Sequence, residues 1–264
     1  MKRPFLPVLA VFVLLLVESC DSSSDPAPVE PEKLTPIRME VLDMSYDLVY
    51  DNLNRKEKLS TTQVLPGGTL KSDHFFTYEN GKIVESSGNE LWRYVYTYDG
   101  DQIIRTDEFI DTHLTQHYTF SYDDRDRLIE SITWQDIPEE GGLIPVYKET
   151  FQYNSQNNVT EHRLYYFDSG TKTHRILTSF FFSDYDDKVN TEEYFIGYGF
   201  NPNVRFKVNN PGKMVVINRH NVITSTDLYT YTYEGNFAEK KQTHSTLVNG
   251  NIVEYETRYF LESR

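Results

Sequence analysis

The sequence predicts an all-β protein, an antiparallel meander of about 14 strands. Three observations lead to this prediction. Aromatic residues make up 14% of the 264 residues, with 20 Tyr and 16 Phe, and both residue types favour strands. A short pattern of aromatic, turn and aliphatic residues recurs along the chain. No segment after residue 37 combines a long stretch of helical period with helix caps.

The recurring pattern is an aromatic residue, any residue, a tyrosine, an Asp, Glu or Asn, a few turn residues and then an aliphatic residue. Clear copies occupy 76–83, 96–103, 120–128, 151–159 and 231–237, and weaker ones lie at 49–51 and 182–186. The turns carry pairs such as Asn80 with Gly81 and Asp99 with Gly100, which tolerate positive φ in tight hairpins. Each copy therefore predicts one β-hairpin, and consecutive hairpins predict strands paired in sequential order.

The strands alternate with a period of two, so Trp92, Tyr94 and Tyr96 must share one face of the sheet. We expect such aromatic stripes to pack in a core or to line a concave face; the alternative is a platform on which a sugar ring stacks. Trp92, Tyr94, Tyr96 and Trp134 are the candidate ligand-contact residues. The opposite faces carry polar residues and should be wet. A strongly curved open sheet and a closed barrel both fit, and closing about 14 strands would leave a lumen.

The first residues have the organisation of a signal peptide. Lys2 and Arg3 supply a positive region, and residues 9–17 are apolar but too few to span a bilayer comfortably. Cys20 follows and is the only cysteine, so the chain forms no internal disulfide. Ser, Asp and spaced Pro then predict an extended tether. The predicted division is a signal peptide over 1–19, an acylated cysteine and tether over 20–36, and a β-domain over 37–264.

Residues 16–20 resemble the signal of a bacterial lipoprotein, although Glu18 departs from the usual small or apolar residue. The resemblance implies cleavage before Cys20 and acylation of that cysteine, which would anchor the protein in a membrane. Asp21 and Asp25 resemble the surface-export signal of Bacteroidetes lipoproteins. We therefore expect an outer-membrane lipoprotein that faces the cell surface. A periplasm-facing lipoprotein and an ordinary secretory signal are the alternatives.

Residues 120–131 resemble a YD (Rhs) repeat, with Asp126 where these repeats often have Gly. The arrangement over 37–264 is similar to a family of Bacteroidetes lipoproteins, a domain of unknown function with a porin-like fold. This resemblance implies a meandering β-sheet curved into a barrel-like form. It implies no activity and no catalytic residue.

Candidate ionisable sites are sparse. The formal net charge of -14 leaves no basic footprint for nucleic acid. His113 and His117 would share a strand face but lie too far apart to chelate a metal easily, so we expect two polar surface residues. Acidic turns at 123–126 and 184–187 have carboxylates spaced as in some Ca²⁺ sites, but they lack a complete EF-hand loop. We expect solvated turns there, with Asp making local hydrogen bonds.

No motif places a nucleophile, a base or metal ligands together, so we expect neither enzymatic activity nor a cofactor. The expected function is a non-enzymatic binding or scaffold module for a glycan or a protein, because a curved aromatic face offers contact area. An envelope structural protein and a glycan-acting enzyme are the alternatives. An integral outer-membrane barrel is a further structural alternative, but Glu254, Glu256 and Arg258 would interrupt its apolar outer band.

The Cys20→Ala variant tests the lipid anchor. Because the expected acylation starts at the thiol of Cys20, the variant should incorporate no labelled palmitate and should leave the membrane fraction. Metabolic labelling followed by cell fractionation measures both effects. A wild-type chain that never takes up label would contradict the expectation. Protease shaving of intact cells answers the separate question of the leaflet.

Overall fold

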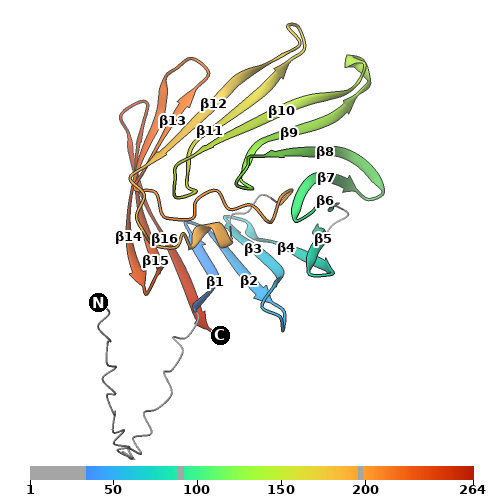
Figure 1. Ribbon diagram of the computed structural model, residues 1–264. Coiled ribbons are helices and arrows are strands. Elements are labelled where there is room, and N and C mark those ends of the chain that lie inside the picture. Colours follow the sequence, from blue (N-terminus) through green and yellow to red (C-terminus); the bar gives the residue numbers. More distant parts are fainter. Residues whose placement is uncertain (1–33, 89–91, 196–198) are drawn as a thin grey trace, which may run out of the picture. The chain divides into compact units, whose positions relative to one another are not determined.

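The computed structural model describes residues 34–88, 92–195 and 199–264, and within them the predicted all-β meander is confirmed (Figure 1). Sixteen antiparallel strands follow one another around a closed barrel. The ring closes where β1 pairs with β16, from Leu34 opposite Ser263 to Val41 opposite Thr257. Of the two arrangements that fit the sequence, the closed barrel is the one that forms.

The strands are β1 (Leu34–Val41), β2 (Met44–Tyr50), β3 (Lys56–Leu65), β4 (Gly68–Glu79), β5 (Lys82–Gly88), β6 (Trp92–Asp99), β7 (Gln102–Ile110), β8 (His113–Tyr122), β9 (Leu128–Ile137), β10 (Gly142–Tyr153), β11 (Val159–Asp168), β12 (Thr173–Ser183), β13 (Lys213–Asn218), β14 (Ile223–Glu234), β15 (Phe237–Leu247) and β16 (Ile252–Ser263). Two short 3-10 helices also occur, η1 (Pro138–Glu140) and η2 (Glu192–Tyr194). Within the described ranges, neither the apolarity nor the length needed for a membrane-crossing helix is found.

Two details differ from the prediction. The barrel has 16 strands, where the repeats predicted about 14; β13 is one that the pattern missed, because residues 214–217 are aliphatic and carry no tyrosine–acid pair. The first strand also begins at Leu34, ahead of the boundary expected at 37. Pro36 led us to expect a tether, because proline has no N–H to donate to a neighbouring strand. The β1–β16 register is irregular between Pro36 and Arg38, and a strand tolerates proline at such a bulge.

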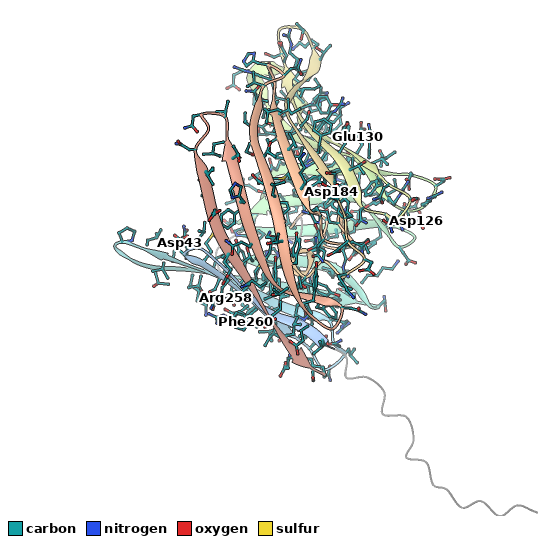
Figure 2. The ribbon with its side chains drawn as sticks, turned by 90° about the vertical axis from the view of Figure 1, so that its left-hand side faces the viewer. Asp43, Asp126, Glu130, Asp184, Arg258 and Phe260 are labelled. Atoms are coloured by element: carbon teal, nitrogen blue, oxygen red, sulfur yellow. The ribbon has the colours of Figure 1, made fainter. Side chains whose placement is uncertain are left out.

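The inward face of the barrel holds the apolar core. Buried aromatic residues such as Tyr96, Phe120 and Phe151 form the larger cluster, and Met39 and Tyr259 belong to the smaller one. The outward face carries exposed charges. Arg258 of β16, for example, pairs with Glu256 at 2.6 Å and is seen on the outer surface in Figure 2. The inward aromatic and outward polar faces follow the period-two pattern of the sequence.

The tyrosine of the repeat joins its hairpin to the preceding one. Its hydroxyl donates a hydrogen bond of 2.5–2.9 Å to a backbone carbonyl near the start of an earlier return strand. Six of these pairs are Tyr50 to Pro36, Tyr78 to Lys56, Tyr98 to Ile83, Tyr122 to Ile103, Tyr153 to Leu128 and Tyr185 to Val159. In the copy at 231–237 the corresponding bond, to the Pro211 carbonyl, comes from the first aromatic residue, Tyr231. Burial raises the pKa of each of these tyrosines, so the hydroxyl remains a donor across the neutral range. We call this series the tyrosine ladder.

The polar residue after the tyrosine closes its own hairpin turn. The Oδ1 atoms of Asp51, Asp123 and Asn154 each accept backbone N–H groups from two and four residues ahead, at 2.9–3.0 Å. Asp126 adopts a φ of 60°, a left-handed conformation that Asp and Asn tolerate better than most residues. The acidic residue and the turn residues of the repeat therefore have defined local roles.

The strands alternate in direction, so the two ends of the barrel carry different turns. The repeat turns 51–55, 80–81, 100–101, 123–127, 154–158 and 235–236 lie at the same end as Leu34 and Ser263, which we call the motif rim. The other hairpin turns, including 42–43, 111–112 and 248–251, form the distal rim. The tyrosine ladder therefore runs around one end of the barrel only.

Replacing Tyr153 by Phe tests the ladder. The substitution removes the hydroxyl that bonds the Leu128 carbonyl at 2.7 Å, and an unsatisfied buried acceptor costs about 1–2 kcal/mol in the free energy of unfolding. The matched control is Tyr147→Phe on the same strand, since Tyr147 is 47% exposed. Urea unfolding measures both variants. Equal stability of the two variants would contradict the structural role of the ladder.

Candidate functional site

A long connection joins β12 to β13 and enters the barrel. It comprises residues 184–212, apart from 196–198, which lie outside the described residues, and we call it the plug. Figure 1 shows it in orange within the ring of strands. Thr191 Oγ1 donates to the Ala238 carbonyl in β15 at 2.9 Å, and Thr106 Oγ1 in β7 donates to the Phe200 carbonyl at 2.6 Å. Because β15 and β7 are opposite in the ring order, the plug crosses the lumen from wall to wall.

One pair of opposite charges joins the plug to the wall, and a second lies within the plug. Glu192 lies 2.6 Å from Lys241 Nζ of β15, and Glu193 lies 3.3 Å from Lys207 Nζ. Burial acts to raise the pKa of Glu192, but the charges of Lys241 and Lys207 outweigh it and hold that pKa below its ordinary value. The Glu193 carboxylate also accepts the Phe206 N–H at 3.0 Å. Glu192 therefore ties the plug to β15, and Glu193 stabilises the conformation of the plug itself.

A cavity of about 500 Å³ lies beside the plug and is lined mainly by aromatic side chains. Tyr94 comes from β6, Phe151 from β10, His162 from β11 and Phe182 from β12, while the plug contributes Phe200 and Phe206. The ammonium of Lys207 and the carboxylate of Glu193 also reach this cavity. We call it the lumen chamber. Its size and apolar walls, with a few polar groups, are typical of a small-ligand site.

A continuous row of rings leads along the wall to the plug. His74 and Trp92 have ring centroids 5.0 Å apart, and Trp92 and Tyr94 are separated by the same distance. Tyr94 is followed by Tyr118 at 6.3 Å, and Tyr118 stacks on Phe200 of the plug at 4.4 Å. Gly88 permits the position of Trp92, because a Cβ at residue 88 would collide with the indole ring.

His74 in this row has no hydrogen-bond partner for its buried Nε2 atom. Burial lowers the pKa of His74 to about 4, so the imidazole is neutral near pH 7. Next to the row, the Glu108 carboxylate accepts hydrogen bonds from the Tyr118 hydroxyl and from Gln116 Nε2, both at 2.8 Å. Aromatic faces and hydrogen-bonding groups therefore lie side by side on this wall.

The structure separates the four aromatic residues that the sequence singled out. Trp92 and Tyr94 lie together in the aromatic row, and Tyr94 lines the lumen chamber. Tyr96 is only 6% exposed, and its hydroxyl donates to the Gly199 carbonyl at 2.6 Å, so it holds the plug. Trp134 pairs in register with His117, next to the inward Tyr118, and therefore lies on the outer face of the barrel.

The histidine prediction is wrong for His117. It is 6% exposed, because Trp134 stacks over it with ring centroids 6.0 Å apart. His113, in contrast, is exposed at the start of β8. The spacing of His113 and His117 places both on one strand, but it does not show that the indole of Trp134, on the next strand, covers His117.

The acidic turns are committed to local structure. Arg127, by hydrogen bonds to the carboxylate, lowers the pKa of Asp123 to about 2. Asp186 departs from the expected solvated turn: its Oδ1 accepts the Lys188 and Asn210 N–H groups at 3.0 Å, and it also accepts the Tyr233 hydroxyl. Over the described ranges, no three His, Cys, Asp or Glu side chains are grouped to hold a metal. Cys20 lies outside these ranges.

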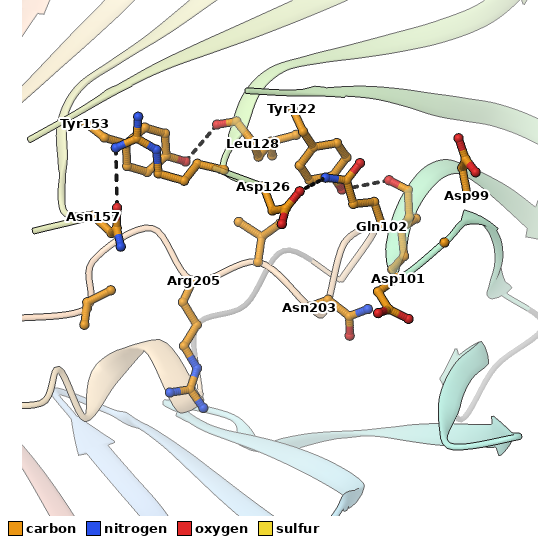
Figure 3. Close-up of a pocket in the computed structure, with 15 residues that line it drawn as sticks. Asp99, Asp101, Gln102, Tyr122, Asp126, Leu128, Tyr153, Asn157, Asn203 and Arg205 are labelled. Atoms are coloured by element: carbon orange, nitrogen blue, oxygen red, sulfur yellow. Dashed lines mark hydrogen bonds between the residues drawn. The ribbon is translucent and has the colours of Figure 1, made fainter. Parts of the chain in front are cut away.

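A second hollow opens at the motif rim, with a volume of about 510 Å³ (Figure 3). Its wall includes ladder residues Tyr122 and Tyr153, and Gln102 Nε2 donates to Asp126 Oδ1 at 2.8 Å across adjacent turns. Arg205 of the plug lies at the lower side of this hollow in Figure 3, and its guanidinium points downward, away from the other labelled residues.

Sequence reasoning missed the plug. The available signal was the long gap between the repeats at 182–186 and 231–237. The part of that gap up to Gly212 contains Asn and Pro and no copy of the repeat.

Comparisons with known proteins bear on the fold. No family model matches the chain, and no curated protein matches it. A porin-like protein from Bacteroides uniformis has a TM-score of 0.61 at 12% identity, covering 89% of this chain and 98% of that one. A porin-like protein from Bacteroides vulgatus gives 0.41 at 11% identity, covering 85% and 97%, and a DUF3836 family protein from the same species gives 0.23 at 10%, covering 40% and 90%. The first of these likenesses shows a shared porin-like fold, as the sequence resemblance implied.

The pKa of His74 predicts a loss of stability in acid. Below its ordinary pKa of 6.5 the unfolded chain binds a proton that the folded chain does not bind until about pH 4. The free energy of unfolding should therefore fall as pH drops from 6.5 to 4, by on the order of 3 kcal/mol from this residue. Urea unfolding at pH 7 and 4.5 measures the fall. His74→Phe should reduce it, whereas His220→Phe, at an exposed turn, should not; identical falls in both variants would contradict the assignment.

Proposed function

We propose that the protein is a non-enzymatic binding module of the cell envelope, anchored through an acylated Cys20. We propose further that it binds a glycan against the rings of Trp92 and Tyr94 in the aromatic row. The observation that carries the proposal is this row of rings, which runs along the wall and ends at the plug beside the lumen chamber. Aromatic rings offer an apolar face to the C–H side of a sugar and polar edges to its hydroxyl groups.

The polar groups beside the rings support a glycan over a purely apolar ligand. Glu108, Gln116 and Tyr118 form one hydrogen-bonded group next to Tyr94. Sugar hydroxyls both donate and accept hydrogen bonds, so a carboxylate, an amide and phenols are suitable partners. The chamber volume of about 500 Å³ suits one or two sugar rings by the usual size of ligand pockets.

The state of the inward carboxylates supports binding without turnover. Glu149 lies 2.6 Å from His162 Nε2, and Asp227 accepts the Ser245 hydroxyl at 2.6 Å. Glu192 and Glu193 are paired with lysines of the wall and the plug. Glycoside hydrolysis needs one carboxyl group as an acid and a second as a base or nucleophile at the scissile bond. Carboxylates already held by structural partners fit a binding role better.

The envelope location rests on the lipoprotein-like signal at residues 16–20 and on the porin-like fold. Exposed charge pairs on the outer face, such as Arg38 with Asp47 at 3.1 Å, favour a barrel surrounded by water and held by its anchor. The plug favours a closed binding barrel over a channel, since it crosses the lumen. We further propose a cell-surface orientation and a YD-like origin of the repeats.

The two tryptophans give a matched test. Glycan-array screening of the mature chain, followed by titration of each hit, should show binding that Trp92→Ala weakens by about tenfold, equivalent to 1.4 kcal/mol. Trp134→Ala should leave the affinity unchanged, because its ring lies on the outer face. Circular dichroism confirms that both variants fold. Equal effects of the two variants, or product release from a bound glycan, would contradict the proposal; no hit at all would favour a structural role.

A further inference from the structure

Four cationic side chains contact the residues of η2, and they fall into two classes. Lys207 and Lys241 are each paired with a glutamate of the plug. Lys56 and Arg205 form no ion pair with any carboxylate of the described residues; their hydrogen bonds go to neutral oxygens of Tyr194. Two positive charges therefore lie together without a counter-charge, in a chain whose net charge is -14.

Tyr194 brings these two cations to one place. Lys56 Nζ, at the start of β3, donates to the Tyr194 carbonyl at 2.6 Å. The guanidinium of Arg205 lies 4.2 Å from the centre of the Tyr194 ring and donates to the Tyr194 hydroxyl at 3.4 Å. The Tyr194 N–H bonds back to Thr191 at 3.2 Å, so η2 holds the tyrosine between the two cations.

Both cations line one pocket of about 280 Å³ near the motif rim. The Asn54 side chain and Thr35 add polar groups to its wall, and Tyr50 and Phe237 add aromatic surface. This pocket is distinct from the lumen chamber, with which it shares no lining residue. Its volume exceeds that of a single oxyanion, which leaves room for a small organic group beside the rings.

Lys56 is not paired with any carboxylate of the described residues. Burial and the charge of Arg205 lower the pKa of Lys56 to about 8, although Glu193 acts in the opposite direction. Glu193 is already engaged by Lys207 and by the Phe206 N–H. A bound anion would supply the missing counter-charge, with the Arg205 fork as the directional donor and Lys56 as the point charge.

From this geometry we infer that the pocket is a binding site for a phosphate monoester, whose oxyanion contacts Lys56 and Arg205 and whose organic group lies against Tyr50 and Phe237. A phosphate dianion matches two adjacent positive charges, and a planar guanidinium binds its oxygens bidentately. The inference is independent of the glycan proposal, because the two sites use different residues.

Thermal unfolding of the mature chain tests the site with inorganic phosphate, phenyl phosphate and chloride at equal ionic strength. Phosphate should raise the Tm relative to chloride, and phenyl phosphate should do so at a lower concentration because its ring adds apolar contact. Arg205→Gln should weaken the apparent affinity for phosphate by about tenfold. The control is Arg258→Gln on the outer face, which should keep the full response to phosphate.

The Lys56→Met variant should change two quantities in opposite directions, the Tm in chloride and the increase in Tm that phosphate causes. Because it removes a buried charge without a counter-charge, its Tm in chloride should be higher than that of the wild type, while its response to phosphate should be lost. Equal Tm values in phosphate and chloride for the wild type would overturn the inference. A phosphate response that survives in the Lys56→Met, Arg205→Gln double variant would also overturn it. Neither result would affect glycan binding at Trp92.

Discussion

The hydrogen bond from a repeat tyrosine to a carbonyl of the preceding hairpin is the interaction on which the barrel depends. Backbone pairing joins β7 to β8 and β9 to β10, and the tyrosine bond adds a side-chain link between the same neighbouring hairpins near the motif rim. The residue before the accepting carbonyl adds to the contact: Arg55 lies over Tyr78 at 4.3 Å, and Arg127 lies over Tyr153 at 4.9 Å. One short motif therefore specifies a strand, a turn and the attachment of that turn to its neighbour.

The same hydroxyl groups connect the wall to the plug. Tyr122 donates to Ile103 and accepts a hydrogen bond from Asn201 Nδ2 at 2.9 Å, so one phenol serves both structures. Tyr185, at the start of the plug, donates to the Val159 carbonyl of β11. Tyr231 of β14 donates to the Pro211 carbonyl, at the end of the plug. The ladder thus continues past the plug instead of stopping at it. This continuity explains how a 16-stranded ring accommodates a crossing segment without losing its regular rim.

The repeat was sufficient to predict the strand class, the sequential order and the shared face of Trp92 and Tyr94, because these follow from period-two alternation and local turn chemistry. Closure was not predictable, because it depends on the pairing of β1 with β16, residues far apart in the chain. The plug was not predictable for the same reason, because its contacts join residues far apart in the chain. Glu192 and Lys241, for example, form a pair only in the folded barrel. Trp134 shares its residue type with Trp92, but strand register decides that they lie on opposite faces.

The seam between β1 and β16 also constrains how the protein forms. During synthesis the first strand is complete long before its partner, so its hydrogen-bonding edge stays open until the last residues appear. The plug is made before β13 to β16 and can settle on a sheet that is still open on one side. Closing the ring then joins the two ends of the β-domain, a slow step because the contacts are maximally non-local. Until that step is complete, the open edge of β1 can pair with the strand edge of another chain.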